Sequence, residues 1–407
     1  MKKQEIFDSY KNNIMPTYTK TPLIFIKGKG SRLWDIDHKE YLDFFPGWGV
    51  GNLGHCYPKV MQAVRDQVSK LIFIPNNFFH IPQAKLAAEI VFRTFPAKVF
   101  FCNSGAEANE AAIKFSRKFG ASTPLSADGE SSRTIGKGRF EVVTFENSFH
   151  GRTLATLAAT GQKKYQSGFD PLPEGFKTVK FNDINAVKNA ISDKTVAVML
   201  ELIQGEGGVN LADKDFVLEL RKLCDEKNML LIIDEVQTGI GRTGKLFCYQ
   251  DYGITPDIVT LAKALGGGLP IGMMIAKKEI ADTLGPGMHA STFGGGLVIC
   301  KAALGVLRGI QKEKLLQNAS KISEYIFQKL NELKNKYPVI KEIRGMGLMI
   351  GVELNQEGKS IVEKCMEKGL LINCTHDTVL RLMPALNTSK KEVNKAVGIL
   401  EEVLRGN

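Results

Sequence analysis

The sequence lacks long hydrophobic runs, paired cysteines and clustered histidines. In its 407 residues no apolar stretch approaches the roughly 20 residues that a membrane-spanning helix requires. The amino-terminal residues also lack the apolar core of a secretory signal. The seven cysteines are scattered without a C-x-x-C pair, which is typical of reduced thiols in a cytoplasmic enzyme. The six histidines include no H-x-x-x-H pair, so we expect a cytoplasmic protein without a metal site.

The glycine-rich segments do not support nucleotide binding or serine-hydrolase chemistry. Residues 239–244 read G-x-G-x-x-G, but no helical pattern follows them, which argues against a dinucleotide site. The same glycines nearly form a P-loop. However, Leu246 occupies the position of the required Ser or Thr, and the acidic strand precedes the loop instead of following it. No G-x-S-x-G occurs, so a serine hydrolase is not expected either.

The charge is strongly positive but interspersed. The formal net charge is +11 at pH 7, yet Lys and Arg never run longer than two in a row and acidic residues lie between them. A nucleic-acid-binding protein would gather these charges into a stripe or patch. We therefore expect no nucleic-acid partner and no membrane partner, and interpret the charge as a basic surface that helps to attract dicarboxylate substrates.

Short apolar runs alternate with helical patterns between residues 60 and 290. Buried strands interleaved with helices indicate an α/β fold whose central sheet is mostly parallel. The predicted strands lie at 98–102, 140–145, 196–200, 229–233 and 258–261. The polar segment 121–138 is expected to be a surface excursion, because few connections within compact domains are as long.

The last hundred residues have a different pattern. A helical period covers 304–333, strands are predicted at 347–354, 370–372 and 379–382, and a final helix lies near 391–404. This pattern suits a smaller α+β domain, and the length of the chain also favours two domains. We predict that residues 59–300 form the large domain, and that 1–58 and 301–407 build the small one.

Two predicted strands lead to side chains of complementary chemistry. The run 230–233 ends at Asp234, and the run 257–261 leads to Lys263, with three glycines just beyond at 266–268. Parallel strands deliver such residues to the same edge of a sheet. Pyridoxal phosphate requires this pair: an amine that bonds covalently to its aldehyde, and a carboxylate that keeps its pyridine nitrogen protonated. The sequence therefore predicts pyridoxal 5′-phosphate as the cofactor.

A third predicted strand leads directly to the start of a helix. Ser104, Gly105 and Ala106 open this helix, where free backbone N–H groups and the helix dipole favour a phosphate. The same residues suit a capping box, in which Ser104 bonds to the N–H of Glu107 and the glutamate reaches back. The residues alone leave both interpretations open.

Segments along nearly the whole chain resemble the class III pyridoxal-phosphate aminotransferases. The resemblance is carried mainly by 231–244 (LIIDEVQTGIGRTG) and 261–272 (LAKALGGGLPIG). Further matching segments are 54–55 (GH), 103–108 (NSGAEA), 148–153 (SFHGRT), 204–208 (QGEGG) and 381–384 (RLMP). The resemblance implies a fold-type I pyridoxal-phosphate transferase and a homodimer with shared active sites.

The resemblance also implies which residues contact the cofactor. They are Ser104, Gly105, Ala106, Phe149, Asp234, Val236, Gln237, Lys263 and Thr292. Lys263 and Asp234 are the catalytic pair, since the lysine first holds the cofactor and then acts as the general base. Phe149 stacks on the pyridine ring, with Val236 on its other side. Thr292 reaches the phosphate of the neighbouring subunit's cofactor.

For the substrate, the resemblance implies two arginines, a glutamate and a serine. Arg152 matches a residue that clamps a substrate carboxylate, and Arg381 matches a second such arginine. Two arginines suit glutamate, which carries a carboxylate at each end. Glu206 matches the glutamate that masks Arg381 when the substrate has no second carboxylate, and Ser291 lies near the substrate.

The implied reaction is transamination of an ω-amino donor with 2-oxoglutarate. The favoured donor is N2-acetylornithine, which assigns the reaction to arginine biosynthesis. Relatives that act on ornithine, succinylornithine, succinyl-diaminopimelate or 4-aminobutyrate share the cofactor residues. An aminomutase on the same scaffold and a non-enzymatic binding protein are the alternatives of other classes. Two departures bear on the donor: Leu202 replaces a usual proline, and Trp48 is bulkier than the residue common at its position.

Overall fold

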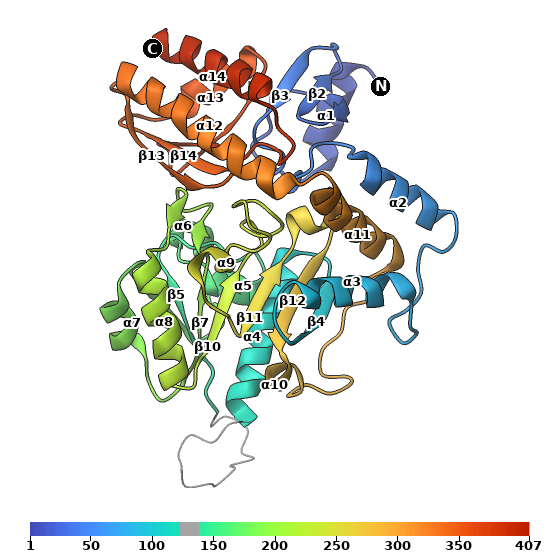
Figure 1. Ribbon diagram of the computed structural model, residues 1–407, viewed down its shortest axis with the longest axis vertical. Helices are drawn as coiled ribbons and strands as arrows, with labels where there is room; N and C mark the ends of the chain where they lie inside the picture. Colours follow the sequence, from blue (N-terminus) through green and yellow to red (C-terminus); the bar gives the residue numbers. More distant parts are fainter. Residues whose placement is uncertain (123–137, 407) are drawn as a thin grey trace.

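A seven-stranded sheet lies at the centre of the molecule (Figure 1). The computed structural model describes residues 1–122 and 138–406, so positions 123–137 of the expected excursion 121–138 lie outside the described residues. In the order in which they lie side by side, the strands are β4 (Ala97–Cys102), β12 (Gly272–Lys277), β11 (Ile258–Leu261), β10 (Leu230–Asp234), β7 (Thr195–Leu200), β5 (Glu141–Phe145) and β6 (Phe176–Val179). Neighbouring strands are parallel except where β12 pairs with β4 and β11. The predicted α/β fold with a mostly parallel sheet is confirmed.

The central strands β7, β10 and β11 are buried along their whole length, because both faces of the sheet are covered. Val142 belongs to a buried cluster that includes Ala112 and Phe115 of α4 (Gly105–Ser122). Val143, the next residue of β5, belongs to a second buried cluster with Phe216 of α8 (Lys214–Glu226). Successive side chains of a strand point to opposite faces, so each strand contributes to both clusters.

The direction of the strands determines where the functional side chains gather. Strand β12 is antiparallel to both of its neighbours, so β4 runs the same way as β11. The carboxyl ends of β4, β5, β7, β10 and β11 therefore share one edge of the sheet. Asp234 is the last residue of β10, and each of the other four strand ends is followed within a few residues by a side chain of interest, namely Ser104, Phe149, Glu201 and Lys263.

Shorter elements surround this sheet. The helices are α2 (Pro58–Val68), α3 (Ile81–Phe92), α5 (Leu154–Ala159), α6 (Lys163–Gln166), α7 (Ile184–Ala190), α9 (Tyr249–Tyr252), α10 (Lys278–Ala281) and α11 (Leu297–Lys312). A two-stranded ribbon consists of β8 (Ile203–Gln204) and β9 (Asn210–Leu211). Lys263 begins a 3₁₀ helix, η1 (Lys263–Gly266).

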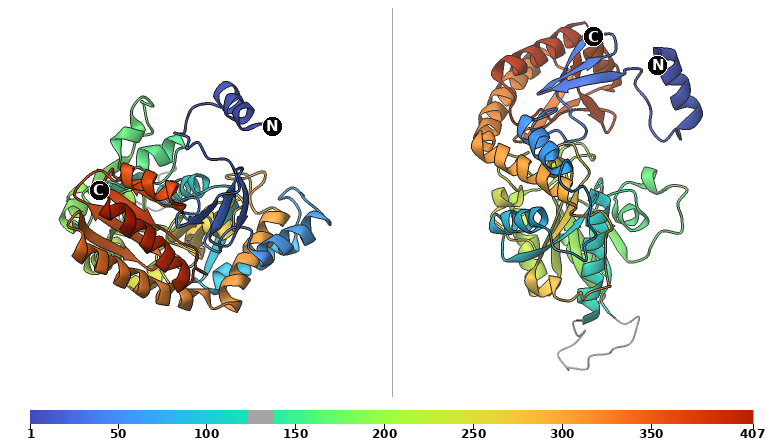
Figure 2. Two further views of the ribbon diagram at one scale, coloured as in Figure 1. Left: turned by 90° about the horizontal axis from the view of Figure 1, so that it is seen from above. Right: turned by 90° about the vertical axis from the view of Figure 1, so that its right-hand side faces the viewer.

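The two ends of the chain lie together above the central sheet (Figure 1). One four-stranded sheet consists of β1 (Phe25–Lys29), β2 (Arg32–Asp35), β3 (Glu40–Asp43) and β15 (Leu370–Leu371). Because β15 pairs with β3, this sheet joins the amino-terminal and carboxyl-terminal segments. A second sheet has the order β13 (Ile340–Met346), β14 (Met349–Leu354), β17 (Val379–Leu382) and β16 (Asn373–Thr375). The helices here are α1 (Lys3–Asn13), α12 (Leu315–Lys336), α13 (Lys359–Glu367) and α14 (Lys390–Arg405), and α1 projects from the body (Figure 2).

Two local expectations differ from the structure. The single helical period predicted over 304–333 is two helices, α11 and α12, because Lys314 between them has a left-handed backbone with φ 52°. The strand predicted from residue 347 begins at Met349, after a turn at Gly347 with φ 59°. A side chain at Gly347 would collide with the backbone of Thr243, so glycine is required there.

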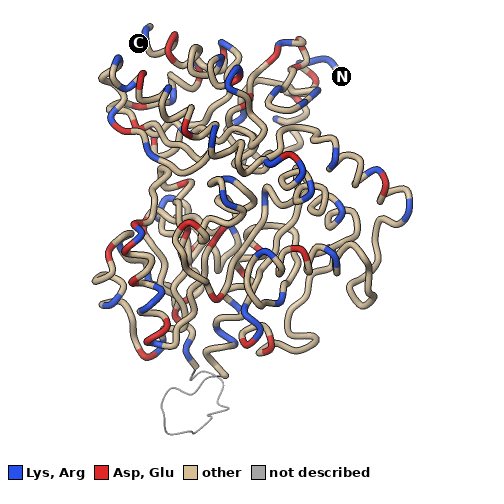
Figure 3. Tube along the Cα trace, viewed as in Figure 1, with Lys and Arg blue, Asp and Glu red and all other residues tan. Residues whose placement is uncertain are grey.

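The distribution of charge and the composition of the helices complete the description of the fold. Basic and acidic residues are interspersed along most of the described chain (Figure 3). Among the described residues, no helix combines the length and apolarity needed to cross a membrane. The same residues hold no cluster of three or more metal-ligating side chains.

Candidate active site

A cavity of about 500 Å³ opens at the carboxyl edge of the central sheet. Nine of the residues predicted for the site line it, namely Ser104, Gly105, Ala106, Phe149, Arg152, Asp234, Val236, Gln237 and Lys263. The fold therefore brings together segments that lie up to about 160 positions apart in the sequence. The cavity has the size and the mixed polar lining of a small-molecule site.

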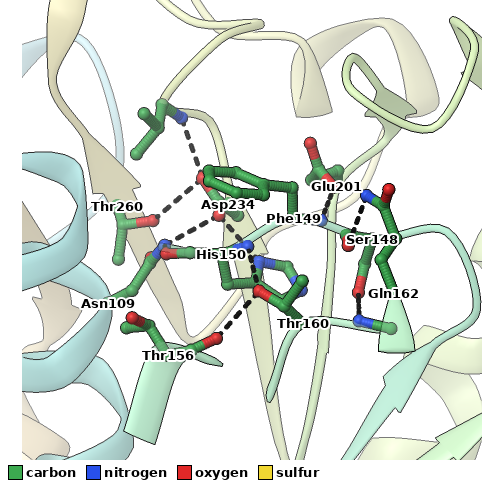
Figure 4. A network of polar contacts seen from close by, with 12 residues as sticks. Asn109, Ser148, Phe149, His150, Thr156, Thr160, Gln162, Glu201, Asp234 and Thr260 are labelled. Atoms are coloured by element: carbon green, nitrogen blue, oxygen red, sulfur yellow. Dashed lines mark hydrogen bonds and ion pairs between the residues drawn. The ribbon is translucent and has the colours of Figure 1, made fainter. Parts of the chain in front are cut away.

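Asp234 is the centre of a buried polar network (Figure 4). Its carboxylate is 3% exposed. Oδ2 accepts a hydrogen bond from Asn109 Nδ2 at 2.8 Å and lies 2.8 Å from His150 Nδ1. Oδ1 accepts from the backbone N–H of Val236 at 3.0 Å. These partners fix the carboxylate in position and compensate the cost of burying its charge.

His150 is the partner of Asp234 that can itself carry a charge. A carboxylate only accepts hydrogen bonds, so Nδ1 of His150 carries the proton that bonds to Asp234. Burial, the largest influence, would lower the pKa of His150, but the hydrogen bond and negative charge of Asp234 raise it above its ordinary value. His150 Nε2 is buried without a partner among the described residues.

Lys263 follows β11 and reaches the same cavity. Its backbone is in the left-handed region, with φ 44°, which non-glycine residues adopt only when the surroundings enforce it. Burial lowers the pKa of its amine to about 8, although the carboxylates of Glu206 and Asp234 act in the opposite direction. A substantial share of the amine is therefore neutral near physiological pH, as a nucleophile or general base requires.

Glu201 is a second buried carboxyl group that lines the cavity. It follows β7 as Asp234 ends β10, and Oε2 accepts from the backbone N–H of Phe149 at 2.9 Å. Burial raises the pKa of Glu201 to about 8 against the opposing charge of His150, and the negative charge of Asp234 acts in the same direction as burial. Its hydrogen bond holds the backbone of the aromatic residue that is predicted to stack on the cofactor.

The start of α4 contains the predicted cap and still leaves room for an anion. The N–H of Glu107 donates to Ser104 Oγ at 3.1 Å, and Glu107 Oε2 accepts from the backbone N–H of Asn103 at 2.6 Å. The first N–H groups of a helix, here those of Gly105 and Ala106, have no acceptor within the helix. Capping and phosphate binding are thus compatible at this position.

Arg152 lies exposed at the rim of the cavity. The carbon of its guanidinium is 4.1 Å from the ring centroid of Tyr165 and 5.5 Å from that of Phe149. No hydrogen bond or ion pair joins this guanidinium to any residue that the structure describes. Its donors are consequently available to a substrate carboxylate.

Arg381 is fully buried and lies outside the cavity lining. Nη1 donates to Glu206 Oε1 at 2.9 Å, and this same oxygen accepts from Gln237 Nε2 at 3.1 Å. The positive charge of Arg381 lowers the pKa of Glu206 below its ordinary value, in spite of burial. Gln237 therefore connects the arginine–glutamate pair to the cavity.

Besides Arg381 and Glu206, two further predicted residues, Ser291 and Thr292, lie beyond the cavity lining. Ser291 Oγ accepts from Asn103 Nδ2 at 3.2 Å, which connects it to the start of α4. Thr292 is exposed, and no described side chain of its own chain joins it to the cavity. The roles assigned to these residues stay predictions.

Sequence reasoning did not select four residues of the network. Asn109, His150, Glu201 and Thr260 all surround Asp234 or the cavity. Glu201 had a usable signal, because it ends an apolar run in the same way as Asp234. Asn109 and Thr260 had no such signal. The sequence does not reveal whether an asparagine within a helix, or a threonine within a strand, faces the site.

The likeness to known proteins covers almost the entire chain. The sequence profile of the family Aminotransferase class-III matches residues 14–404. The chain belongs to the class-III aminotransferases. It is 49% identical over 405 residues to the acetylornithine aminotransferase of Methanocaldococcus jannaschii, with 99% of this chain and 98% of the relative covered.

Solved structures of aminotransferases have the same fold. The ornithine aminotransferase of Toxoplasma gondii has a TM-score of 0.93 and 31% identity, with 100% of this chain and 94% of that chain covered. The acetylornithine aminotransferase of Elizabethkingia anophelis has a TM-score of 0.86 and 29% identity, with both chains covered completely. The predicted family and the fold-type I architecture of this aminotransferase are confirmed.

Pyridoxal 5′-phosphate is the cofactor of this family, as predicted. The cavity fits it. Lys263 supplies an amine of lowered pKa and Asp234 a fixed carboxylate, and Gln237 Oε1 is buried without a partner among the described residues. A Cβ on Gly105 would lie 2.8 Å from Cγ1 of Val236, so glycine keeps the space beside the helix start open.

Proposed function

We propose that this aminotransferase transfers the ω-amino group of N2-acetylornithine to 2-oxoglutarate, giving N-acetylglutamate 5-semialdehyde and glutamate, in arginine biosynthesis. The observation that carries the proposal is the pairing of a free arginine, Arg152, with a masked one, Arg381. A reaction that alternates between a substrate with one free carboxylate and one with two needs this arrangement. The names of the most similar relatives, at 43–49% identity, support the same donor.

The cofactor residues divide between holding the cofactor and moving protons. Bound pyridoxal 5′-phosphate supplies an aldehyde that takes up the amino group and a ring that withdraws electrons from the substrate. Asp234 holds the proton on the ring nitrogen, and the amine of Lys263 moves the proton at the substrate carbon. The start of α4, at Ser104 to Ala106, binds the phosphate. The phenolic oxygen is the partner proposed for Gln237, while Phe149 and Val236 enclose the ring.

The substrate residues distinguish the two half-reactions. Arg152 binds the α-carboxylate of acetylornithine while Glu206 neutralises Arg381, and Ser291 lies beside the substrate. With glutamate or 2-oxoglutarate, Glu206 gives way and the second carboxylate pairs with Arg381. A guanidinium binds a carboxylate through two parallel hydrogen bonds, so the exchange replaces one charge-assisted pair by another.

A panel of amino donors tests the proposed substrate. Single-turnover rates of the holoenzyme with acetylornithine, ornithine and 4-aminobutyrate, each without 2-oxoglutarate, give kcat/KM for the donor half-reaction alone. We expect acetylornithine to exceed the other two by about tenfold or more. A preference for ornithine would replace the proposed donor, and the likeness to Toxoplasma gondii ornithine aminotransferase makes that the second candidate.

We further propose a cytoplasmic homodimer in which Thr292 completes the partner's site. All seven cysteines are free thiols, as a reducing compartment favours. Large apolar side chains are exposed around the loop that carries Thr292, and a second copy would cover them. These side chains are Phe73, Phe78, Phe79, Ile81 and Phe293.

Mixing two inactive variants tests the shared site. Lys263→Ala lacks the amine, whereas Thr292→Glu damages the phosphate site of its partner. In a mixed dimer one site contains both lesions and the other contains neither, so activity should reappear after subunit exchange. Continued inactivity with heterodimers demonstrated by native mass spectrometry would show that each site is built within one chain.

A further inference from the structure

The buried guanidinium of Arg381 has two partners besides Glu206. Nε and Nη2 both donate to Asn373 Oδ1, at 3.1 and 2.9 Å. Nη1 donates to the carbonyl oxygen of Gly205 at 2.6 Å as well as to Glu206 at 2.9 Å. A guanidinium carries five N–H groups. Only one of them, on Nη2, is therefore left without an acceptor among the described residues.

Strand pairing places Asn373 beside the arginine. Strand β16 pairs antiparallel with β17, and Asn373 lies directly opposite Arg381 in the register. Residues opposite each other on such strands are close enough for their side chains to interact. Thr375, two positions along β16, donates from Oγ1 to the carbonyl oxygen of Glu206 at 2.7 Å. The same short strand thus contacts both members of the arginine–glutamate pair.

The position of the amide decides how a carboxylate can approach. A carboxylate binds a guanidinium bidentately along one of two edges, either Nε with Nη2 or Nη1 with Nη2. Asn373 Oδ1 occupies the first edge. Glu206 contacts Nη1, which belongs to the second edge, and Nη1 also donates to the carbonyl oxygen of Gly205. Since an amide is neutral, Asn373 closes its edge without cancelling the charge of Arg381.

We propose that Asn373 is a specificity-determining positioning residue that restricts Arg381 to a single carboxylate-binding edge. Glu206 and the second carboxylate of a dicarboxylate substrate then compete for that edge and exclude each other. With the Nε edge open, a dicarboxylate would pair with Arg381 while Glu206 stayed in place, and the mask would no longer discriminate. This inference rests on the proposed function, because it explains how the masked arginine distinguishes glutamate from an ω-amino donor.

A double-mutant cycle tests the inference. Glu206→Gln, Asn373→Ala and the double variant are compared as holoenzymes by the ratio of donor kcat/KM for glutamate to that for acetylornithine. We expect Glu206→Gln alone to raise this ratio by about tenfold, the effect of one charge-assisted contact. In the Asn373→Ala background the same change should raise it by less than about threefold, because the edge formed by Nε and Nη2 is already open.

The two proposals fail in different ways. An unchanged ratio in Glu206→Gln alone would overturn the masking of Arg381, and this inference with it. A normal response to Glu206→Gln, combined with equal effects in both backgrounds, would overturn only the role of Asn373. Asn373→Ser replaces the alanine variant in the cycle if the latter does not fold.

A charge placed on the closed edge gives a second measurement. Asn373→Asp keeps the shape of the side chain but adds a carboxylate beside Nε, so it should raise KM for 2-oxoglutarate by about tenfold. We expect kcat/KM for acetylornithine to change by less than about twofold. Asn355→Asp adds the same charge at an exposed position of the small domain and should alter neither value. Identical behaviour of the two aspartate variants would overturn the inference.

Discussion

Arg152 lies exposed at the rim of the cavity, whereas Arg381 is buried with no exposed surface. Arg152 rests on the rings of Tyr165 and Phe149, and no described residue accepts a hydrogen bond from it. Arg381 donates to two carbonyl-type oxygens and a carboxylate, and the ring of Phe45 lies 4.8 Å from its guanidinium carbon. The two groups have the same chemistry and opposite surroundings.

The difference indicates what each arginine contributes to recognition. A carboxylate can bind Arg152 without displacing any protein group, so this residue suits the carboxylate that all substrates share. Binding at Arg381 requires the departure of Glu206, and removing one partner of a buried pair is costly unless another charge replaces it. Only a substrate with a second carboxylate provides that charge. We infer that the exposed arginine supplies affinity and the buried one supplies discrimination.

The largest loss of turnover is expected from a change at Lys263, which does not involve either arginine. Lys263→Ala removes both the anchor of the cofactor and the general base, so turnover with every donor should fall below detection while the protein stays folded. Borohydride reduction of the wild-type holoenzyme, followed by peptide mass spectrometry, should find the pyridoxyl group on Lys263. Lys222→Ala, at an exposed lysine, is the control and should retain full activity. Label on a different lysine would contradict the assignment.

Removal of the exposed arginine should damage both half-reactions. Arg152→Ala loses the carboxylate contact common to acetylornithine and glutamate, so kcat/KM should fall by about 10²-fold for both. Arg152→Lys keeps the charge but loses the bidentate fork, and should recover part of the loss. Stopped-flow spectra of each half-reaction give the two values. A loss confined to one substrate would show that Arg152 is not the shared clamp.

Alteration of the buried arginine should separate the substrates. Arg381→Lys retains a cation near Glu206 but loses the fork, so kcat/KM for glutamate and 2-oxoglutarate should fall by about tenfold or more. The acetylornithine half-reaction should change by less than about twofold. Thermal unfolding of the variant measures any structural damage. Equal losses with both donors in a stable variant would make the Arg381–Glu206 pair purely structural.

Residues at strand ends are predictable from the sequence, and residues that act across elements are not. Asp234 and Lys263 were predictable because apolar runs point to their position at one edge of a parallel sheet. Arg381 was found through the family motif at 381–384. Asn373, only eight positions earlier, was not found, because its role depends on the antiparallel register of β16 with β17.

The fold shows the same division. Five of the seven strands of the central sheet followed from apolar runs, but β6 and β12 were missed, although β12 is buried along most of its length. Its glycine and methionines carry little preference for a strand, and the antiparallel pairing with β4 and β11 supplies the missing stability.

Tyr165 was also missed. It comes from the four-residue helix α6, and only the folded chain shows that its ring lies under Arg152.

The aromatic support of Arg152 should make a smaller contribution. Tyr165→Leu removes the ring face beneath the guanidinium, an interaction worth about 0.5–1 kcal/mol at an exposed site, or roughly two- to fivefold in kcat/KM. The loss should be the same for acetylornithine and glutamate. Tyr165→Phe preserves the ring and should behave as wild type. Equal activity of the leucine and phenylalanine variants would show that the ring does not orient Arg152.

The smallest expected effect is a shift in the pKa of Lys263. It compares the surroundings of the two arginines, because Glu206, the partner of Arg381, and Arg152 are changed in turn. In the cofactor-free protein, burial lowers the pKa of Lys263 to about 8, and the carboxylate of Glu206 is the largest influence that raises it. Removing that charge in Glu206→Gln should lower the pKa further, because an amine loses its proton more readily without a nearby anion. The midpoint of Lys263 labelling by an amine reagent, followed across a pH series by peptide mass spectrometry, should therefore move to lower pH. Arg152→Gln should leave the midpoint in place, since the exposed guanidinium is screened by solvent. A midpoint that shifts in Arg152→Gln and stays in place in Glu206→Gln would contradict the inference that the buried Arg381–Glu206 pair acts on the reaction centre.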